Sequence, residues 1–96
     1  MSFDRVVRCS WPECREPAIY KVAALWSDRR LSELKTYGFA CVDHVEDVFR
    51  GAEARWLAYE PDPDERLREV GIYCLEPGRS DRRLERDRAL EESLRL

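Results

Sequence analysis

Histidine is almost missing from this sequence, because His44 is the only one among 96 residues. Apolar runs are short, and none approaches the roughly 20 residues that a membrane-spanning helix needs. Residues 1–8 hold no apolar stretch of signal-peptide length. These absences argue against a membrane protein, a secreted disulfide scaffold and, in so short a chain, a multidomain enzyme. We expect a small protein located in the cytoplasm.

The motifs of common catalytic sites are missing as well. A single histidine rules out an H-E-x-x-H motif, and the four glycines form no glycine-rich phosphate loop. Carboxylates are plentiful, with 20 Asp and Glu residues, but most fall on expected helix surfaces and loops, where solvation explains them. We therefore expect that the protein is not an enzyme.

An excess of basic residues is lacking too, since the net charge is −3. Residues 1–42 carry +2, residues 43–70 carry −5 and residues 71–96 are neutral. Because neutralising phosphates supplies most of the non-specific affinity for nucleic acids, this distribution makes a nucleic-acid partner the less favoured hypothesis. That hypothesis would require a local basic patch formed by Arg5, Arg8, Arg15, Lys21, Arg29, Arg30 and Lys35.

The sequence does contain the pattern of a β-hairpin. Residues 18–26 and 34–40 are rich in β-branched and aromatic residues and are separated by a polar break. In the second run we expect Tyr37 and Phe39 to share one face of the sheet. Residues 71–76 predict a third antiparallel strand beside the hairpin, and residues 65–70 predict one helical turn.

Helical periodicity follows the hairpin. Asp43 is expected as the N-cap and Glu46 as its partner in a capping box. Apolar residues then recur at spacings of three and four, which predicts a helix that faces the core. This stripe consists of Val42, Val45, Phe49, Ala52, Trp56 and Tyr59, and Val48 widens it.

A second helix is expected at the C-terminus, where half of the residues are charged. It would be capped by Ser80 or Asp81 and run to the end of the chain. Leu84, Leu90 and Leu94 form a narrow apolar seam along it. This seam allows the helix to dock on the domain, to pair with another chain, or to lie open with ion pairs on its surface.

The cysteines carry the chemistry of the sequence. Cys9 and Cys14 form a C-x4-C pair in a proline-flanked loop, and Cys41 and His44 form a C-x2-H pair at the start of the main helix. Zinc in structural sites takes four sulfur or nitrogen donors in a tetrahedron. These four residues therefore predict one structural Zn²⁺. The alternatives are free cysteines with an exposed histidine, or disulfides.

The surroundings of this predicted site support the metal hypothesis. The helix N-terminus favours the anionic thiolate of Cys41, and the rings of Trp11 and Phe39 are placed to shield the site from water. Cys74 is left over and is expected to be a half-buried core thiol. Its alternatives are a replacement for one of the four ligands and a redox-responsive thiol.

In its order of cysteine loop, hairpin and helix-borne pair, the sequence from Cys9 to Tyr59 resembles a treble-clef zinc finger. The resemblance implies that Cys9 and Cys14 are ligands on a zinc knuckle and that Cys41 and His44 are ligands on the first turn of the helix. The family's knuckle usually has two residues between its cysteines and a glycine nearby. Here there are four and no glycine, so a zinc-ribbon-like loop is the alternative. Taken whole, the chain resembles short uncharacterised bacterial proteins with the same cysteine pattern, which implies no activity.

These patterns together predict an α+β fold. A zinc-bound antiparallel sheet, made of the hairpin and a third strand, packs on one main helix in residues 1–78, and residues 79–96 form the charged C-terminal helix. The leading functional hypothesis is a protein-interaction or regulatory module that presents Tyr20, Trp26, Tyr37 or Tyr73. The C-terminal helix would engage an unknown protein partner or a second copy. The alternatives are a nucleic-acid-binding zinc finger and a thiol-based redox or metal sensor.

Overall fold

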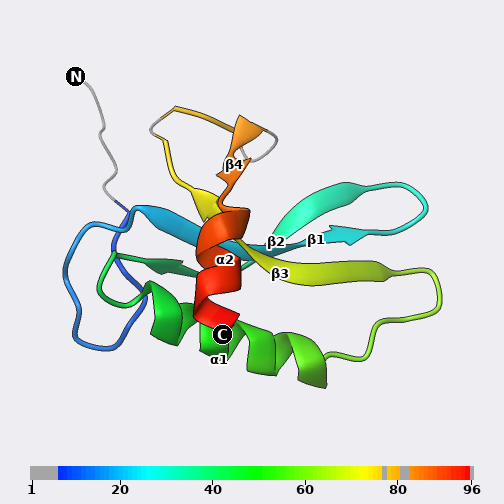
Figure 1. Cartoon of the computed structure of the whole chain (residues 1–96). Helices are drawn as coiled ribbons and strands as arrows, with labels where there is room; N and C mark the ends of the chain where they lie inside the picture. The colour runs from blue at the N-terminus through cyan, green and yellow to red at the C-terminus, as the bar shows by residue number, and fades with distance from the viewer. Residues whose placement is uncertain (1–6, 77, 81–82, 96) are drawn as a thin grey trace.

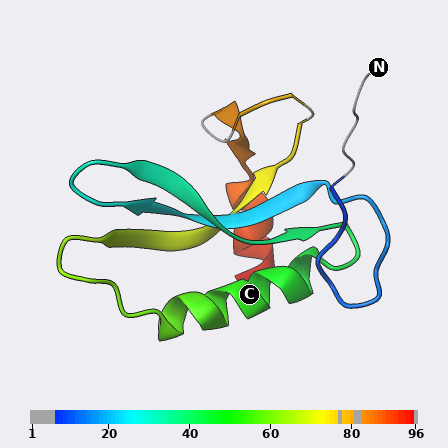
Figure 2. The same cartoon turned by 180° about the vertical axis from the view of Figure 1, so that it is seen from behind.

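The computed structural model describes residues 7–76, 78–80 and 83–95 and has the predicted α+β fold. A four-stranded antiparallel sheet in the order β2-β1-β3-β4 packs against two helices (Figures 1 and 2). The strands are β1 (Tyr20–Ser27), β2 (Ser32–Ala40), β3 (Arg66–Cys74) and β4 (Glu85–Arg86), and the helices are α1 (Val45–Ala58) and α2 (Arg88–Arg95). None of the helices in these ranges is long and apolar enough to cross a membrane.

The predicted hairpin is confirmed, but its alternation is broken at Tyr37. This residue has no partner on β1, because the register between the two strands shifts there. A bulge of this kind changes the face to which the next side chain points. Tyr37 packs against the core, whereas Phe39 pairs with Lys21, whose ammonium group lies 5.9 Å from the centre of the Phe39 ring. The expectation that Tyr37 and Phe39 share a face is therefore wrong.

Strand β3 is longer than predicted, and a short fourth strand follows it. The helical turn predicted over residues 65–70 is wrong, because residues 66–70 belong to β3. Leu67 and Val70 pack toward the core while Arg66 and Arg68 are exposed, so this charged stretch is a half-buried strand. Strand β4 pairs with the end of β3, which makes the sheet four-stranded rather than three-stranded.

Helix α1 covers one face of the sheet and forms the core with it (Figure 1). Trp56 packs against this core as predicted, but Val42 is 63% exposed because the helix begins only at Val45. The buried residues of α1 are Val45, Val48, Phe49 and Ala52, and those of the sheet that meet them are Val22, Ala24, Ala40, Val70 and Ile72.

The start of α1 differs from the predicted capping box. His44 occupies the N-cap position and makes no capping hydrogen bond with its side chain. Its carbonyl accepts the Val48 N–H at 2.9 Å, and its own N–H donates to the Cys41 carbonyl at 3.3 Å. The turn from Cys41 to His44 therefore determines where the helix begins, and the assignment of Asp43 as the N-cap is wrong.

Helix α2 is also shorter than predicted. It begins at Arg88, and the Asp87 carboxylate accepts the Leu90 N–H at 3.0 Å, which is the bond of an N-cap residue. The predicted cap at Ser80 is wrong because the chain first forms β4. The alternative cap, Asp81, lies outside the described residues.

Of the three placements considered for the C-terminal helix, the structure shows docking on the domain. Leu90 and Leu94 pack against the core, and α2 contacts β3 (Figure 1). At its C-terminal end, Arg95 pairs with Glu53 of α1 at 3.2 Å. The division of the chain between residues 78 and 79 stays a prediction.

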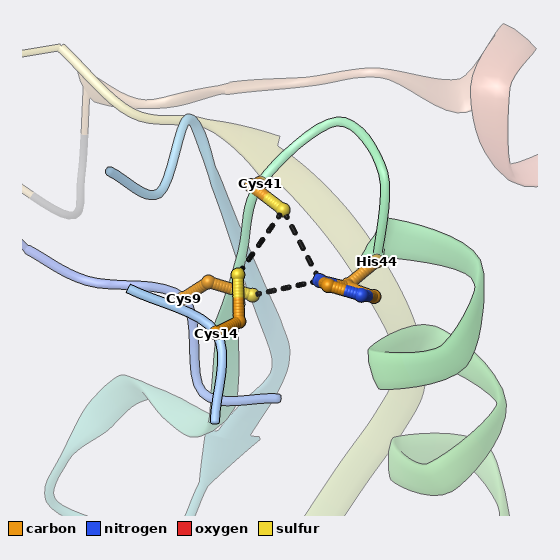
Figure 3. A group of neighbouring side chains, drawn as sticks. All are labelled: Cys9, Cys14, Cys41 and His44. Carbon is orange, nitrogen blue, oxygen red and sulfur yellow. Dashed lines mark hydrogen bonds between the residues drawn. The ribbon is translucent and has the colours of Figure 1, made fainter. Parts of the chain in front are cut away.

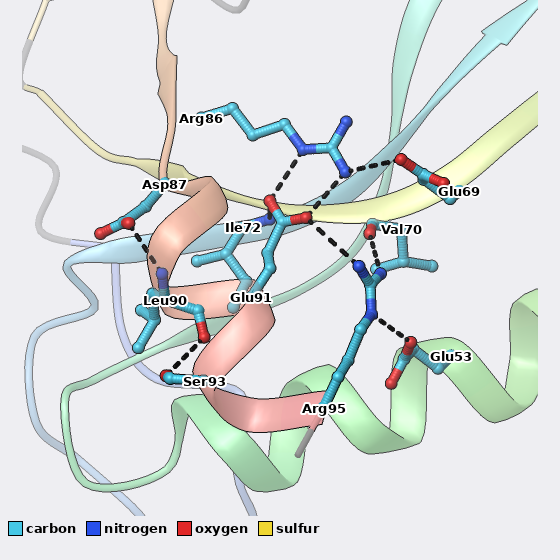
Figure 4. A network of polar contacts seen from close by, with 10 residues as sticks. All are labelled: Glu53, Glu69, Val70, Ile72, Arg86, Asp87, Leu90, Glu91, Ser93 and Arg95. Carbon is cyan, nitrogen blue, oxygen red and sulfur yellow. Dashed lines mark hydrogen bonds and ion pairs between the residues drawn. The ribbon is translucent and has the colours of Figure 1, made fainter.

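A buried ion pair holds α2 at the edge of β3 (Figure 4). Glu91 is 2% exposed and accepts two hydrogen bonds of 2.7 Å from Arg86. It also accepts the Ile72 N–H at 3.0 Å, and Arg95 donates to the Val70 carbonyl at 3.2 Å. Side chains of α2 thus form hydrogen bonds with backbone groups of β3 that the short strand β4 does not reach. These hydrogen bonds protect this edge of the sheet from pairing with another chain.

Candidate metal centre

Three segments that are far apart in the sequence bring the predicted ligands together. Cys9 and Cys14 lie on the loop before β1, Cys41 directly follows β2, and His44 directly precedes α1 (Figure 3). The expectation that Cys41 and His44 lie on the first turn of the helix is therefore wrong, because α1 begins only at Val45. The hairpin returns the chain to the loop, so that Cys41 meets Cys14 across 27 positions of sequence. Cys9 and Cys41 are buried, while Cys14 and His44 are half-buried.

The separations of the donor atoms match a tetrahedral ion site. Ligands at zinc distances of 2.0–2.3 Å stand about 3.8 Å apart for two sulfurs and about 3.5 Å apart for a sulfur and a nitrogen. The Cys14 and Cys41 sulfurs are 3.9 Å apart, and His44 Nδ1 is 3.4 Å from the Cys41 sulfur and 3.8 Å from the Cys9 sulfur. All four donor atoms lie within 4.8 Å of one another, so this Cys3His cluster could hold one metal ion.

Disulfides are not formed in this cluster, and all four cysteines of the chain are free. A sulfur separation of 3.9 Å between Cys14 and Cys41 is far beyond the bonded distance of about 2.05 Å. The disulfide alternative of the sequence is therefore contradicted by the structure.

Backbone hydrogen bonds fix the loop that carries Cys9 and Cys14. The Cys14 N–H donates to the Trp11 carbonyl at 3.0 Å, which closes a turn with Pro12 and Glu13 at its centre. Glu13 has a φ of 68°, in the left-handed region, as the third residue of a type II turn requires. Glu13 thus adopts the conformation that a glycine would adopt most easily, in the loop that lacks one.

Ser10 joins this loop to the edge of β2, a role that sequence analysis missed. Its N–H donates to the Phe39 carbonyl at 2.8 Å, and its hydroxyl accepts the Phe39 N–H at 2.9 Å. Gly38 gives α1 room beside this loop, because a Cβ there would lie 3.0 Å from the Val48 side chain, whereas its 3.6 Å distance from the Ser10 hydroxyl would be an ordinary contact. The sequence offered one signal for this role, a serine directly after the first cysteine, because serine side chains commonly form hydrogen bonds with nearby backbone groups.

Of the two predicted aromatic shields, Trp11 lies against the site. Its ring stacks on the His44 ring with centroids 5.7 Å apart and an angle of 22° between the planes. Trp11 is still 40% exposed, so it covers the imidazole from outside. Phe39 contributes its backbone through Ser10, and shielding of the site by its ring stays a prediction.

The surroundings of the cluster shift the pKa values of Cys9 and Cys14 in opposite directions. Burial raises the pKa of Cys9, but hydrogen bonds from the backbone at Cys41 and Trp11 outweigh it and lower that pKa to about 7. A backbone hydrogen bond at Glu16 lowers the pKa of Cys14, yet burial and the neighbouring Cys9 and Cys41 leave it raised. A cation among the sulfurs would remove this competition, because its charge stabilises every thiolate around it.

Cys74 stands apart from the cluster, at the end of β3 opposite Tyr20. It is half-buried, as expected of a core thiol. Burial raises its pKa, and the carboxylates of Asp87, Glu85 and Glu76 raise it further. A thiol with a raised pKa forms little of the reactive thiolate, which disfavours the redox-sensor hypothesis.

The side chains proposed for partner binding are less exposed than expected. Tyr20, Trp26, Tyr37 and Tyr73 are half-buried, and two of them, Tyr20 and Tyr37, pack against the core. In the hypothetical basic patch, Lys21 is only 8% exposed and Arg29 pairs with Asp64 at 2.9 Å. Arg5 lies outside the described residues.

Comparisons of the chain with protein-family models, curated proteins and solved structures found no match in any of the three.

Proposed function

We propose that this chain is a small structural-zinc domain of the treble-clef type, which acts through protein interaction and not as an enzyme. The observation that carries the proposal is the Cys3His cluster, with donor separations of 3.4–3.9 Å between neighbouring ligands. These separations suit an ion bound at zinc distances.

The donor set favours zinc over harder cations. Thiolate and imidazole ligands suit Zn²⁺, whereas Mg²⁺ and Ca²⁺ prefer oxygen. With three thiolates and a neutral imidazole, one Zn²⁺ would change the net charge from −3 to −4, because three negative and two positive charges are added.

A structural role follows from the number of protein donors. Cys9, Cys14, Cys41 and His44 would fill all four positions of a tetrahedral zinc, and a catalytic zinc keeps one position open for water or substrate. The ion would tie the loop before β1 to the start of α1. In a chain of 96 residues this cross-link adds to a core that is small for its surface.

The treble-clef type is supported by the order of elements around the ligands. The cysteine loop, the β1–β2 hairpin and α1 follow one another, and the second ligand pair immediately precedes α1. Ligand spacing in the loop, with four residues between Cys9 and Cys14, is the departure from that family, and the left-handed Glu13 accommodates it.

Binding of Co²⁺ to the reduced protein tests the metal site. Cobalt in a tetrahedral Cys3His site should give the visible ligand-field bands of a thiolate complex, and added Zn²⁺ should displace it. Replacing Cys14 with serine should weaken these bands, and Cys74→Ser is the matched control that should leave them unchanged. A folded wild-type protein without these bands contradicts the proposal.

A further inference from the structure

The edge of the sheet formed by β2 is partly open, whereas the opposite edge is covered by side chains of α2. Strand β2 lies at the end of the order β2-β1-β3-β4, so half of its backbone N–H and C=O groups point away from β1. At its C-terminal end, Ser10 bonds to Phe39 and Arg55 donates to the Tyr37 carbonyl at 2.8 Å. From residue 32 to residue 36, the outer edge has no hydrogen-bond partner among the described residues.

A groove of about 430 Å³ runs beside this open edge. It lies between β2 and the C-terminal end of α1, and its lining residues are Lys35, Thr36, Tyr37, Arg55, Ala58 and Tyr59. The groove therefore places side-chain contacts next to unpaired backbone, which is the combination that an added β-strand uses for affinity and specificity.

The two cations of this groove are held by aromatic rings. The Lys35 ammonium lies 3.7 Å from the centre of the Tyr59 ring and 5.7 Å from that of Tyr37, and the Arg55 guanidinium lies 5.4 Å from the Tyr37 ring. Neither cation forms an ion pair with a carboxylate in the described part of the chain.

Tyr37 adds a hydrogen-bonding group to the same place. Its hydroxyl oxygen is buried and has no hydrogen-bond partner within the described residues. A carboxylate in the groove would accept a hydrogen bond from this hydroxyl only after the Tyr37 ring moved to bring the oxygen to the surface.

We propose that the edge of β2 from Ser32 to Thr36 binds an extended acidic segment of a partner protein. The segment would add to the sheet as a fifth strand, with a carboxylate between Lys35 and Arg55. This inference rests on the proposed interaction function and names the surface and the chemistry of the partner. Five residues of edge correspond to about 17 Å of extended peptide, which suits a short linear segment.

A second copy of this chain would satisfy the charges of the groove only in part. Antiparallel pairing of β2 with β2 about Leu34 would set Glu33 of one copy opposite Lys35 of the other, but residues 32–36 hold no second carboxylate for Arg55. An acidic strand instead supplies the carboxylates that these two cations lack. The test below distinguishes the two occupants.

The test uses the zinc-loaded, isotope-labelled full chain and a capped eight-residue peptide of alternating glutamate and threonine. Amide chemical shifts should change along residues 32–36, with a Kd at or below about 1 mM. The same peptide with glutamine in place of glutamate should bind at least about threefold more weakly, because it lacks the charge. A peptide N-methylated along one edge should lose binding, because it cannot pair with β2.

Variants of the protein test the role of the groove. Lys35→Gln should weaken binding at least about threefold, and Lys35→Arg should restore it. The matched control is Arg68→Gln, because Arg68 is exposed on β3 and is separated from β2 by β1. This control removes one positive charge and should leave the Kd unchanged.

Several results would overturn this inference. They are the absence of binding at about 1 mM, shift changes confined to other surfaces, and equal binding of the glutamine peptide. A dimer in solution that Thr36→Pro converts to monomer would assign the edge to a second copy instead. The zinc content of the same sample is also measured, so that failure of the zinc proposal and failure of the peptide-binding proposal can be told apart. A protein that contains zinc but does not bind the peptide contradicts only the proposed binding of an acidic segment to β2.

Discussion

Two groups of polar side chains attach segments to the same sheet, and their electrostatics are opposite. The Cys3His cluster joins the cysteine loop to the start of α1, and the α2 dock, formed by Glu91, Arg86 and Arg95, joins α2 to β3. In the Cys3His cluster, three thiols and one imidazole converge, and thiolates formed among them repel one another unless a cation lies between them. In the α2 dock, Glu91 is surrounded by Arg86, Arg95 and the Ile72 N–H, so its charge is balanced within the chain. The difference predicts that the attachment of the cysteine loop depends on an external ion, whereas the attachment of α2 depends only on groups of the chain itself.

Removing the metal should have the largest effect on the stability of the fold, and it should release the cysteine loop from α1 before it affects the attachment of α2. Apparent zinc-binding free energies in small finger peptides are about 10–16 kcal/mol at neutral pH, and this energy stabilises the folded state. A strong chelator should therefore abolish ordered amide signals of residues 9–16 and of the start of α1. Heteronuclear NMR with and without chelator measures this loss.

The control for metal removal is Cys74→Ser, because Cys74 is free and lies outside the cluster. This variant should respond to chelator as the wild type does. If the chelator leaves all amide signals of the cysteine loop in place, the attachment of this loop does not depend on a metal ion, and in this respect it does not differ from the attachment of α2.

Breaking the ion pair should have the next largest effect. Glu91→Ala leaves the Ile72 N–H without its partner and leaves Arg86 only its longer ion pair with Glu69, at 3.3 Å; removing one member of a buried pair costs about 3–5 kcal/mol. Because the Arg86 side chain keeps 17% exposure, we expect about 3 kcal/mol, near the lower limit. Denaturant unfolding of the zinc-loaded protein measures this change.

The neighbouring variant Glu92→Ala is the matched control, since Glu92 is exposed. It should change the free energy of unfolding by less than about 0.5 kcal/mol. Equal effects of the two variants would mean that the buried pair contributes nothing to the attachment of α2.

Acid should weaken the α2 dock through Glu91. Burial raises the pKa of Glu91, but hydrogen bonds from Arg86 and from the Ile72 backbone outweigh it, so the pKa lies below its ordinary value of 4.5. A lowered pKa in the folded state gives stability that is complete above the ordinary value and is lost as the pH falls through the folded value.

This pH dependence is measured as a difference between two proteins. Wild type should lose more unfolding free energy than Glu91→Gln between neutral and acidic pH, because only the wild type protonates at this position. The thiols contribute equally to both proteins and cancel. Parallel pH curves would show that Glu91 has an unshifted pKa.

Alanine substitutions at two glycines should have the smallest and most local effects on stability. A Cβ on Gly71 would approach Arg86 Nε to 2.5 Å, so Gly71→Ala should displace Arg86 from Glu91 at a cost of about 1–2 kcal/mol. A Cβ on Gly51 meets nothing within 4 Å, so Gly51→Ala should stabilise α1 by up to about 1 kcal/mol. Thermal unfolding of both variants should therefore shift the Tm in opposite directions. A rise for both would mean that Arg86 is not held against β3.

The parts predicted from sequence are those with a local signature. The spacing of Cys9, Cys14, Cys41 and His44 shows in the chain itself, and the hairpin between them explains how the two pairs meet. The stripe from Val45 to Trp56 was also readable, because burial of one helix face imposes a period near 3.6.

The missed features depend on contacts between distant segments. Residues 66–70 form a strand because β1 offers them an edge, although their charges favoured a helical turn. The bulge at Tyr37 accompanies packing of that ring against the core, and α1 begins at Val45 because the turn from Cys41 to His44 precedes it. Glu91 interrupts the apolar seam of α2, and only the three-dimensional structure reveals that Arg86 balances it.

Native mass spectrometry of the reduced, purified chain counts its bound metal ions. The proposed structural site requires one zinc ion per folded chain, retained by Cys74→Ser and lost or weakened by Cys9→Ser and His44→Ala. A wild-type chain that is folded, shows the native amide spectrum and carries no metal would contradict it.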